Sequence, residues 1–365
     1  MQNEGPEVIK TRMWLKQLFQ RYYGSISSIY MPSDMHRREY GFGSFAKKIT
    51  IRHRSFPDER AFLDYIKKEA PAHVNHSIAR YKFPGADVEM DEKDRLGADL
   101  IFDIDVGDLG LPCAKEHDPG WVCEDCFAGL KEEITKLKDF LSQDFGFTGK
   151  EMVINFSGSR GYHLRIEDER LQSLDEGARK ELVGYLSLDI DLSELIRDVD
   201  GRILGPKPDQ NGLKGRIARN VIAEVGRDPK LESKDLIIGQ ITKGNWGAFP
   251  KGFGQKKTEA YIMKTAVRIP VDAKVTTDMS HLIRLPESLH GGSSLKAKIV
   301  GDLDGFRPLD ECFVFGDEPV KMEMTKAVPA LVAKGREFGP FDEGAVELPE
   351  YLAAYLGAKG FAVVG

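Results

Sequence analysis

Asp103 and Asp105 are the residues of this 365-residue chain whose type and spacing most directly suggest chemistry. They stand two positions apart in the apolar run LIFDIDV (100–106). Side chains at i and i+2 of a strand point to one face, roughly 7 Å apart, so both carboxylates can reach one hard cation or a pair of cations. The alternative is a solvated strand face, but aspartate is depleted in strands. We therefore predict a magnesium or manganese site here.

A second candidate site contains three of the four cysteines. Cys113, His117, Cys123 and Cys126 follow the spacing C-x3-H-x5-C-x2-C, and Cys312 stands alone. A Cys3His set is a common tetrahedral zinc site, and four protein ligands leave no open position for a substrate. The alternative is a redox CxxC pair, which would not need the two upstream ligands. We predict a structural zinc ion.

A glycine-containing turn forms the third candidate site. The stretch SGSRGYHLR (157–165) places Ser157, Arg160 and His163 around a tight turn. Backbone amides of such a turn, together with hydroxyl, guanidinium and imidazole groups, can bind phosphate oxygens. An ordinary hairpin with a solvated arginine would have the same residues, so this pattern alone leaves both interpretations open.

The segment DMSHLIRLPESLH (278–290) carries no chemical signal of its own. Asp278 could be a helix N-cap, and Arg284 and His290 could be surface residues.

The elements that must position these residues follow from hydrophobic periodicity. Alternation predicts strands over 48–54, 100–106, 152–156 and 162–166, the last two forming a hairpin. Helical spacing predicts a helix containing Leu130, Ile134, Leu137 and Leu141 that ends at Gly146. Further helices are expected over 55–69, with Pro57 in the first turn, and over 349–356, closed by Gly357.

The charge of the chain is unevenly distributed. Its 52 basic and 58 acidic residues give a net charge of -6, which argues mildly against a nucleic-acid partner. However, residues 206–268 hold 13 Lys and Arg but only 6 Asp and Glu, so this segment is basic. We expect it to be a loop-rich or helical insertion at the periphery, and we expect weak, salt-sensitive binding of a nucleic-acid template.

The hydropathy pattern bears on location. The sequence has no apolar stretch of eighteen residues, and its first residues, MQNEGPEVIK, lack a secretory pattern. We therefore expect a cytoplasmic protein without a membrane partner.

Taken together, these segments resemble the catalytic small subunit of the archaeal and eukaryotic DNA primase family. The matching stretches occur in the family's order: REYGF (38–42), ITIRHRSF (49–56), GADLIFDID (97–105), the Cys/His knuckle (113–126), DFGF (144–147), SGSRGYHLRI (157–166) and DMSHLIRLPESLH (278–290). Three features depart from the family. One residue between Ser157 and Arg160 differs from the commonest form, His117 replaces a cysteine, and the basic insertion has no alignable segment.

The resemblance implies a mixed α/β primase fold with a zinc knuckle and a variable insertion. The implied domains are a catalytic core over 1–170 and 269–345 with the knuckle at 112–127, an insertion over 171–268, and a C-terminal helix and tail over 346–365. It also implies roles for particular residues. The ligands of Mg²⁺ or Mn²⁺ would be Asp103, Asp105 and Asp278. The incoming triphosphate would be bound by Ser157, Arg160 and His163, with a second basic clamp formed by Arg284 and His290 and further nucleotide contacts made by Glu39 and Arg52.

The activity implied is de novo synthesis of short primers for DNA replication, as a DNA-directed RNA polymerase within a primosome. Its partners would be a large primase subunit, a single-stranded DNA template and NTPs or dNTPs. Alternatives are a repair or end-joining polymerase of the same superfamily, a two-metal phosphodiesterase, and a non-catalytic zinc-containing nucleic-acid-binding subunit. The last would not need the three aspartates, and the phosphodiesterase would not need a triphosphate clamp.

Overall fold

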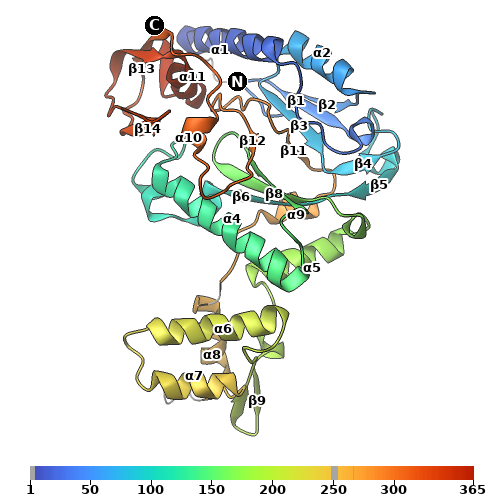
Figure 1. The fold of residues 1–365 in the computed structure, drawn as a ribbon, viewed down its shortest axis with the longest axis vertical. Helices are drawn as coiled ribbons and strands as arrows, with labels where there is room; N and C mark the ends of the chain where they lie inside the picture. Colours follow the sequence, from blue (N-terminus) through green and yellow to red (C-terminus); the bar gives the residue numbers. More distant parts are fainter. Residues whose placement is uncertain (1–4, 248–253, 266) are drawn as a thin grey trace.

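Two four-stranded antiparallel sheets form the centre of the molecule (Figure 1). The computed structural model describes residues 5–247, 254–265 and 267–365. The first sheet, in the order β11-β3-β1-β2, contains β1 (Tyr40–Gly43), β2 (Ile51–Arg54), β3 (His73–Ser77) and β11 (Leu282–Arg284). The second sheet, in the order β12-β7-β8-β6, contains β6 (Leu100–Asp105), β7 (Met152–Phe156), β8 (Gly161–Ile166) and β12 (Lys298–Ile299).

The second sheet contains the strand predicted over 100–106, which ends at Asp105, and the predicted hairpin of β7 and β8. Leu100, Phe102 and Ile104 of β6 are buried, whereas Asp103 and Asp105 remain partly exposed on the other face. Strand β8 lies between β6 and β7 and pairs with both. The alternation of apolar and polar residues therefore sets which face of the sheet carries the carboxylates.

Helix α4 (Glu124–Phe145) packs on β6 and β8. Its apolar positions at 130, 134, 137 and 141 are all buried, as their helical spacing predicts. Gly146 ends the helix with a positive φ of 75°, and its N–H bonds to carbonyl oxygens of the last turn. Other helices around the two sheets are α1 (Pro6–Ser25), α2 (Glu59–Glu69), α3 (Val106–Leu109), α5 (Glu176–Ser187) and α9 (Ala273–Thr277). A two-stranded ribbon, β4 (Ala79–Tyr81) and β5 (Arg95–Ala98), flanks them.

A third sheet closes the C-terminal part of the chain. It has the order β16-β13-β17 and contains β13 (Pro319–Met324), β16 (Gly344–Pro349) and β17 (Ala362–Val364). Helix α11 (Glu350–Lys359) packs on this sheet and on α1, so both ends of the chain meet at the top of Figure 1. The remaining elements here are α10 (Pro308–Glu311), β14 (Leu331–Ala333) and β15 (Arg336–Phe338).

A smaller lobe lies apart from the sheets, at the bottom of Figure 1. Its elements are β9 (Arg197–Val199), β10 (Arg202–Leu204), α6 (Gly212–Arg227), α7 (Lys234–Thr242) and α8 (Gln255–Thr265). The lobe has its own apolar cluster, which runs from Leu188 to Ile262 and includes the buried Trp246. Most of the predicted basic insertion 206–268 therefore forms helices, while its residues 248–253 and 266 lie outside the described residues. The domain division itself stays a prediction.

The mixed α/β prediction is confirmed, but some element boundaries are wrong. Val106 begins helix α3 instead of ending the strand. Helix α2 begins at Glu59 with Asp58 as N-cap, so Pro57 lies before it. Helix α11 continues through Gly357 to Lys359, and Gly360 is its C-cap, with a positive φ of 75°.

Candidate active site

A cleft of about 550 Å³ lies between the two four-stranded sheets. The first sheet and the loop before β2 contribute one wall, and β6, β8 and helix α9 contribute the other. Seven of the predicted site residues line it: Asp103, Asp105, Ser157, Arg160, His163, Arg284 and His290. Residues far apart in sequence thus meet because the two sheets face each other.

Asp103 lies deepest among the acidic residues of the cleft. It pairs in register with His163 on β8, and its Oδ1 lies 3.5 Å from the imidazole Nε2. Burial, followed by the negative charges of Asp105 and Asp272, raises the pKa of Asp103 to about 7. A carboxyl group with these neighbours is stabilised in its ionised form when a cation binds beside it.

Asp105 begins the short helix α3. Its Oδ1 accepts a hydrogen bond of 2.8 Å from the backbone N–H of Gly107, and its Oδ2 accepts one of 3.1 Å from Arg160 Nε. The ion pair with Arg160 is partly exposed to the cleft. Arg160 thus neutralises a carboxylate in the free protein and can turn to another anion when a cation takes its place.

Asp272, not Asp278, shares the cleft with the two strand aspartates. Its backbone N–H donates to the carbonyl oxygen of Asp103 at 2.9 Å, and its side chain caps helix α9. Asp278 lies at the opposite end of α9 and accepts hydrogen bonds from the backbone N–H and hydroxyl of Ser280, at 2.9 and 2.6 Å. The sequence signal for Asp272 was an N-cap aspartate before Ala-Lys-Val.

The histidines of the cleft are neutral. Burial, followed by the charge of Arg284, lowers the pKa of His163 to about 3, and the same two causes hold the pKa of His290 well below its usual value. Arg284 Nη2 lies 2.7 Å from Nδ1 of His73, whose ring meets that of His290 edge to face. Burial lowers the pKa of Arg284 only to about 10, so within this group of His73, His290 and Arg284 the positive charge is on the arginine.

Two lysines complete the basic wall, and sequence reasoning missed both. Lys48 precedes β2, and Lys359 lies in the last turn of α11, where its Nζ donates to the carbonyl oxygen of Gly120 at 2.6 Å. Burial, then the charge of Arg160, lowers the pKa of Lys359 to about 8. No local pattern could link residue 359 to residue 103, because only the packing of α11 joins them.

Glu39 and Arg52 lie outside the cleft. Glu39 is buried, and its carboxylate accepts hydrogen bonds from Arg52 Nε at 2.7 Å and from the buried Lys93 Nζ at 3.0 Å. Arg52 also donates to the carbonyl oxygen of Ser280. In this structure the pair therefore belongs to an internal ion network.

The predicted Cys/His knuckle assembles as a possible metal centre. The ligand atoms of its four residues all lie within 4.8 Å of one another. Cys126 Sγ lies 3.6 Å from Sγ of Cys113 and of Cys123, and 3.4 Å from Nε2 of His117. Tetrahedral zinc with bonds of about 2.3 Å to sulfur gives sulfur separations of about 3.8 Å, which this set fits. His117 Nδ1 lies 3.1 Å from the carbonyl oxygen of Asp118, which leaves Nε2 for the metal.

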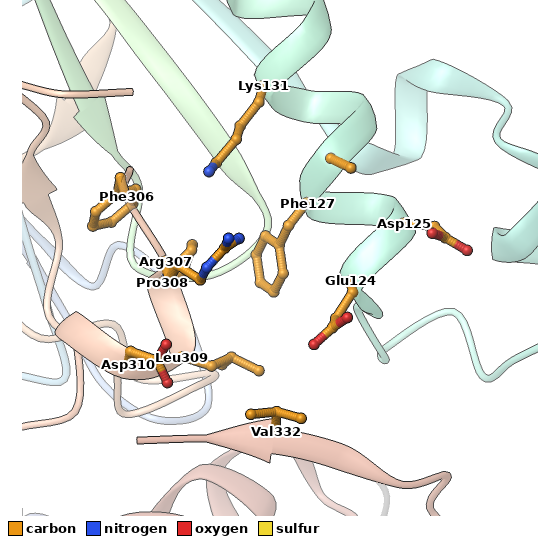
Figure 2. Close-up of a pocket in the computed structure, with 11 residues that line it drawn as sticks. Glu124, Asp125, Phe127, Lys131, Phe306, Arg307, Pro308, Leu309, Asp310 and Val332 are labelled. Carbon is orange, nitrogen blue, oxygen red and sulfur yellow. The ribbon is translucent and has the colours of Figure 1, made fainter. Parts of the chain in front are cut away.

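A separate hollow of about 510 Å³ lies next to the knuckle (Figure 2). Apolar side chains of Phe127, Phe306, Leu309 and Val332 line it, together with charged residues of both signs. It contains none of the predicted site residues.

Among the helices of the described residues, none is long and apolar enough to cross a membrane.

Comparisons with known proteins identify the family of this chain. The family model described as DNA primase small subunit matches residues 102–301. The DNA primase small subunit PriS of Methanococcoides burtonii is 34% identical over 98% of this chain and 99% of its own, and that of Archaeoglobus fulgidus is 34% identical over 96% and 98%. A solved structure, the polymerase domain of Mycobacterium tuberculosis ligase D in complex with DNA, aligns with a TM-score of 0.41 and 16% identity over 80% of this chain and 84% of that one. This chain belongs to the DNA primase small subunit family.

Proposed function

We propose that this chain is the catalytic subunit of a DNA primase that synthesises primers de novo on single-stranded DNA from nucleoside triphosphates. One observation supports this most strongly: the cleft sets three aspartates beside a wall of arginines and lysines. Nucleotidyl transfer requires both, because cations must bridge carboxylates and phosphates while further positive charge binds the triphosphate.

We assign Asp103, Asp105 and Asp272 to the catalytic metal site, with Asp272 in the role that the family resemblance implied for Asp278. Burial raises the pKa of Asp103 most, and the acidic neighbours Asp105 and Asp272, whose charge a bound cation would neutralise, raise it further. Magnesium or manganese would lower the pKa of the attacking 3′-hydroxyl and offset negative charge on the phosphates. Carboxylate oxygens suit either ion.

Basic and polar side chains from both walls of the cleft would bind the triphosphate. Arg160 and Arg284 provide guanidinium donors for phosphate oxygens, and Ser157, His163 and His290 provide uncharged polar groups beside them. Lys359 and Lys48 add positive charge to the cleft. Reaction then requires positioning and charge stabilisation, with no protein nucleophile.

Finer assignments belong to the same proposal. The knuckle would hold structural zinc, a large primase subunit would be the partner, and the protein would act in the cytoplasm with both NTPs and dNTPs as candidate substrates. The division into a core, a 171–268 insertion and a C-terminal helix is likewise proposed; the separate apolar cluster of the lobe supports it. Glu39 and Arg52 would support the first sheet instead of contacting nucleotide.

A direct assay separates this function from its nearest rival. The protein, with and without a large-subunit partner, is incubated with unprimed single-stranded DNA, labelled nucleotides and Mg²⁺ or Mn²⁺. New oligonucleotides on the unprimed template support a primase. Extension of a supplied primer alone would indicate a repair or end-joining polymerase, and shortening of the template would indicate a phosphodiesterase.

A further inference from the structure

A small cavity lies directly behind the cleft, between the same two sheets. Its volume is about 20 Å³, and one water molecule needs roughly 10–15 Å³ measured in this way. His163 and Arg284 line both the cleft and this cavity. The cavity is therefore one side chain away from the proposed triphosphate site.

The strand register explains which side chains meet there. Asn155 on β7 and Asp103 on β6 are both paired with His163 on β8, so the three lie in one row across the sheet. Arg165 follows two residues after His163 and points to the same face. From the first sheet, Arg284 closes the cavity, and Ile101, Val153, Ile283 and Pro286 supply apolar walls.

Four lining residues each carry a buried polar atom that has no hydrogen-bond partner within the protein. These atoms are Asn155 Oδ1, His163 Nδ1, Arg165 Nε and Arg284 Nη1. All four residues are at most 9% exposed. The fifth polar residue of the cavity, His76, already places its Nδ1 3.0 Å from the carbonyl oxygen of Ser77. Buried polar atoms of this kind are normally satisfied by ordered water.

The donors and acceptors match one water molecule. Arg165 Nε and Arg284 Nη1 can only donate, so they satisfy the two lone pairs of the water oxygen. Its two hydrogens then require two acceptors. Asn155 Oδ1 is one, and the only remaining atom of the set is His163 Nδ1. With a proton on Nδ1 there would be three donors for two lone pairs, and one water hydrogen would lack an acceptor.

We propose that a buried water molecule in this cavity, held by Asn155, Arg165 and Arg284, fixes His163 as the tautomer with its proton on Nε2. Asn155 and Arg165 are then positioning residues, because they act on the cleft through His163. The Nε2–H group faces Asp103 Oδ1 at 3.5 Å and presents a donor to anionic oxygens in the cleft. The opposite tautomer would present a lone pair to the same oxygens and repel them.

The structural consequence can be tested without nucleotide or activity. A high-resolution crystal structure should show a single water peak within hydrogen-bonding distance of the four atoms. Long-range ¹H–¹⁵N spectra of the metal-free protein should show the proton of His163 on Nε2. A cavity that is empty or filled by a side chain, or a proton on Nδ1, would overturn the proposal. Because neither readout involves primer synthesis, a protein that bound the water but failed to prime would refute the proposed function alone.

Matched variants test the role of Asn155. Asn155→Leu removes the acceptor, Asn155→Asp retains an acceptor oxygen, and Val153→Ala changes an apolar wall of the same cavity. Asn155→Leu should mix the two His163 tautomers and raise the nucleotide KM about tenfold, with kcat changed less than twofold. Asn155→Asp and Val153→Ala should retain the Nε2 proton. If Asn155→Leu left the His163 tautomer unchanged, or if Val153→Ala altered it equally, Asn155 would not be the positioning residue. If Asn155→Leu does not fold, the spectra of Asn155→Asp and of the wild type still decide which nitrogen of His163 carries the proton.

Discussion

The backbone N–H of Asp272 donates a 2.9 Å hydrogen bond to the carbonyl oxygen of Asp103. This bond ties the first turn of α9 to strand β6 and sets the Asp272 carboxylate beside a strand aspartate 169 positions away in sequence. The acidic cluster is therefore built by two elements that pack against each other, and its geometry depends on the backbone as well as on the carboxylates.

Divalent cations should stabilise the free protein through Asp103. Burial and acidic neighbours raise its pKa from 3.8 in the unfolded chain to about 7. The stability contributed by the protonated carboxyl is therefore fully present below about pH 4, and it is lost as pH rises through about 7. Bound Mn²⁺ should offset that loss. A Mn²⁺ concentration one hundred times its dissociation constant stabilises the folded protein by about 2.7 kcal/mol. Thermal unfolding above pH 7 should show this gain in the wild type and a much smaller one in Asp103→Asn.

Removal of zinc should destabilise the knuckle without affecting the carboxylates of the cleft. Fresh protein should contain one zinc per chain, and Cys126→Ser should lose it, because three remaining ligands bind zinc more weakly. Elemental analysis and thermal unfolding provide the measurements. Cys312→Ser is the matched control, since Cys312 is buried away from the four ligands. A zinc content near zero in protein never exposed to chelators would contradict the assignment.

The ion network of Glu39 should contribute to stability in a pH-dependent way. Burial opposes ionisation, but hydrogen bonds from Arg52 and Lys93 hold the pKa of Glu39 below its usual value. Its stabilisation is therefore present above about pH 4.5 and is lost as pH falls through the lower, folded-state pKa. Glu39→Gln should cost roughly 3–5 kcal/mol at neutral pH and less in acid, as measured by denaturant unfolding. An unchanged stability with a raised nucleotide KM would instead favour the nucleotide contact that the sequence suggested.

Lys359 should make nucleotide binding sensitive to alkaline pH. Because burial and Arg160 lower its pKa to about 8, the free protein loses this positive charge above that pH. The nucleotide KM should rise between about pH 7 and pH 9, where an ordinary lysine would remain charged. Lys359→Gln should flatten this rise, whereas Lys321→Gln, on strand β13 and outside the residues that line the cleft, should leave it intact. If the nucleotide KM depended on pH in the same way in the wild type and in Lys359→Gln, a role of Lys359 in nucleotide binding would be excluded.

The local elements of the site were predictable, but its assembly was not. Alternation identified β6 and the β7–β8 hairpin, and Gly146 marked the end of α4, because each signal depends on neighbouring residues. The choice between Asp272 and Asp278 depends on a bond to β6, and the position of Lys359 depends on α11 packing. Helix α1 was missed altogether, although Leu15, Leu18, Phe19 and Tyr23 form its buried face, because that face covers only the second half of the helix.

The most direct test of the account compares Asp272→Asn with Asp278→Asn in primer synthesis on unprimed single-stranded DNA with Mn²⁺. Both substitutions remove one negative charge from an end of the same five-residue helix, so each controls for the other. The account predicts that Asp272→Asn lowers kcat by roughly a hundredfold or more, with Asp278→Asn within a few-fold of the wild type. Loss of synthesis in Asp278→Asn with near-normal synthesis in Asp272→Asn would contradict it.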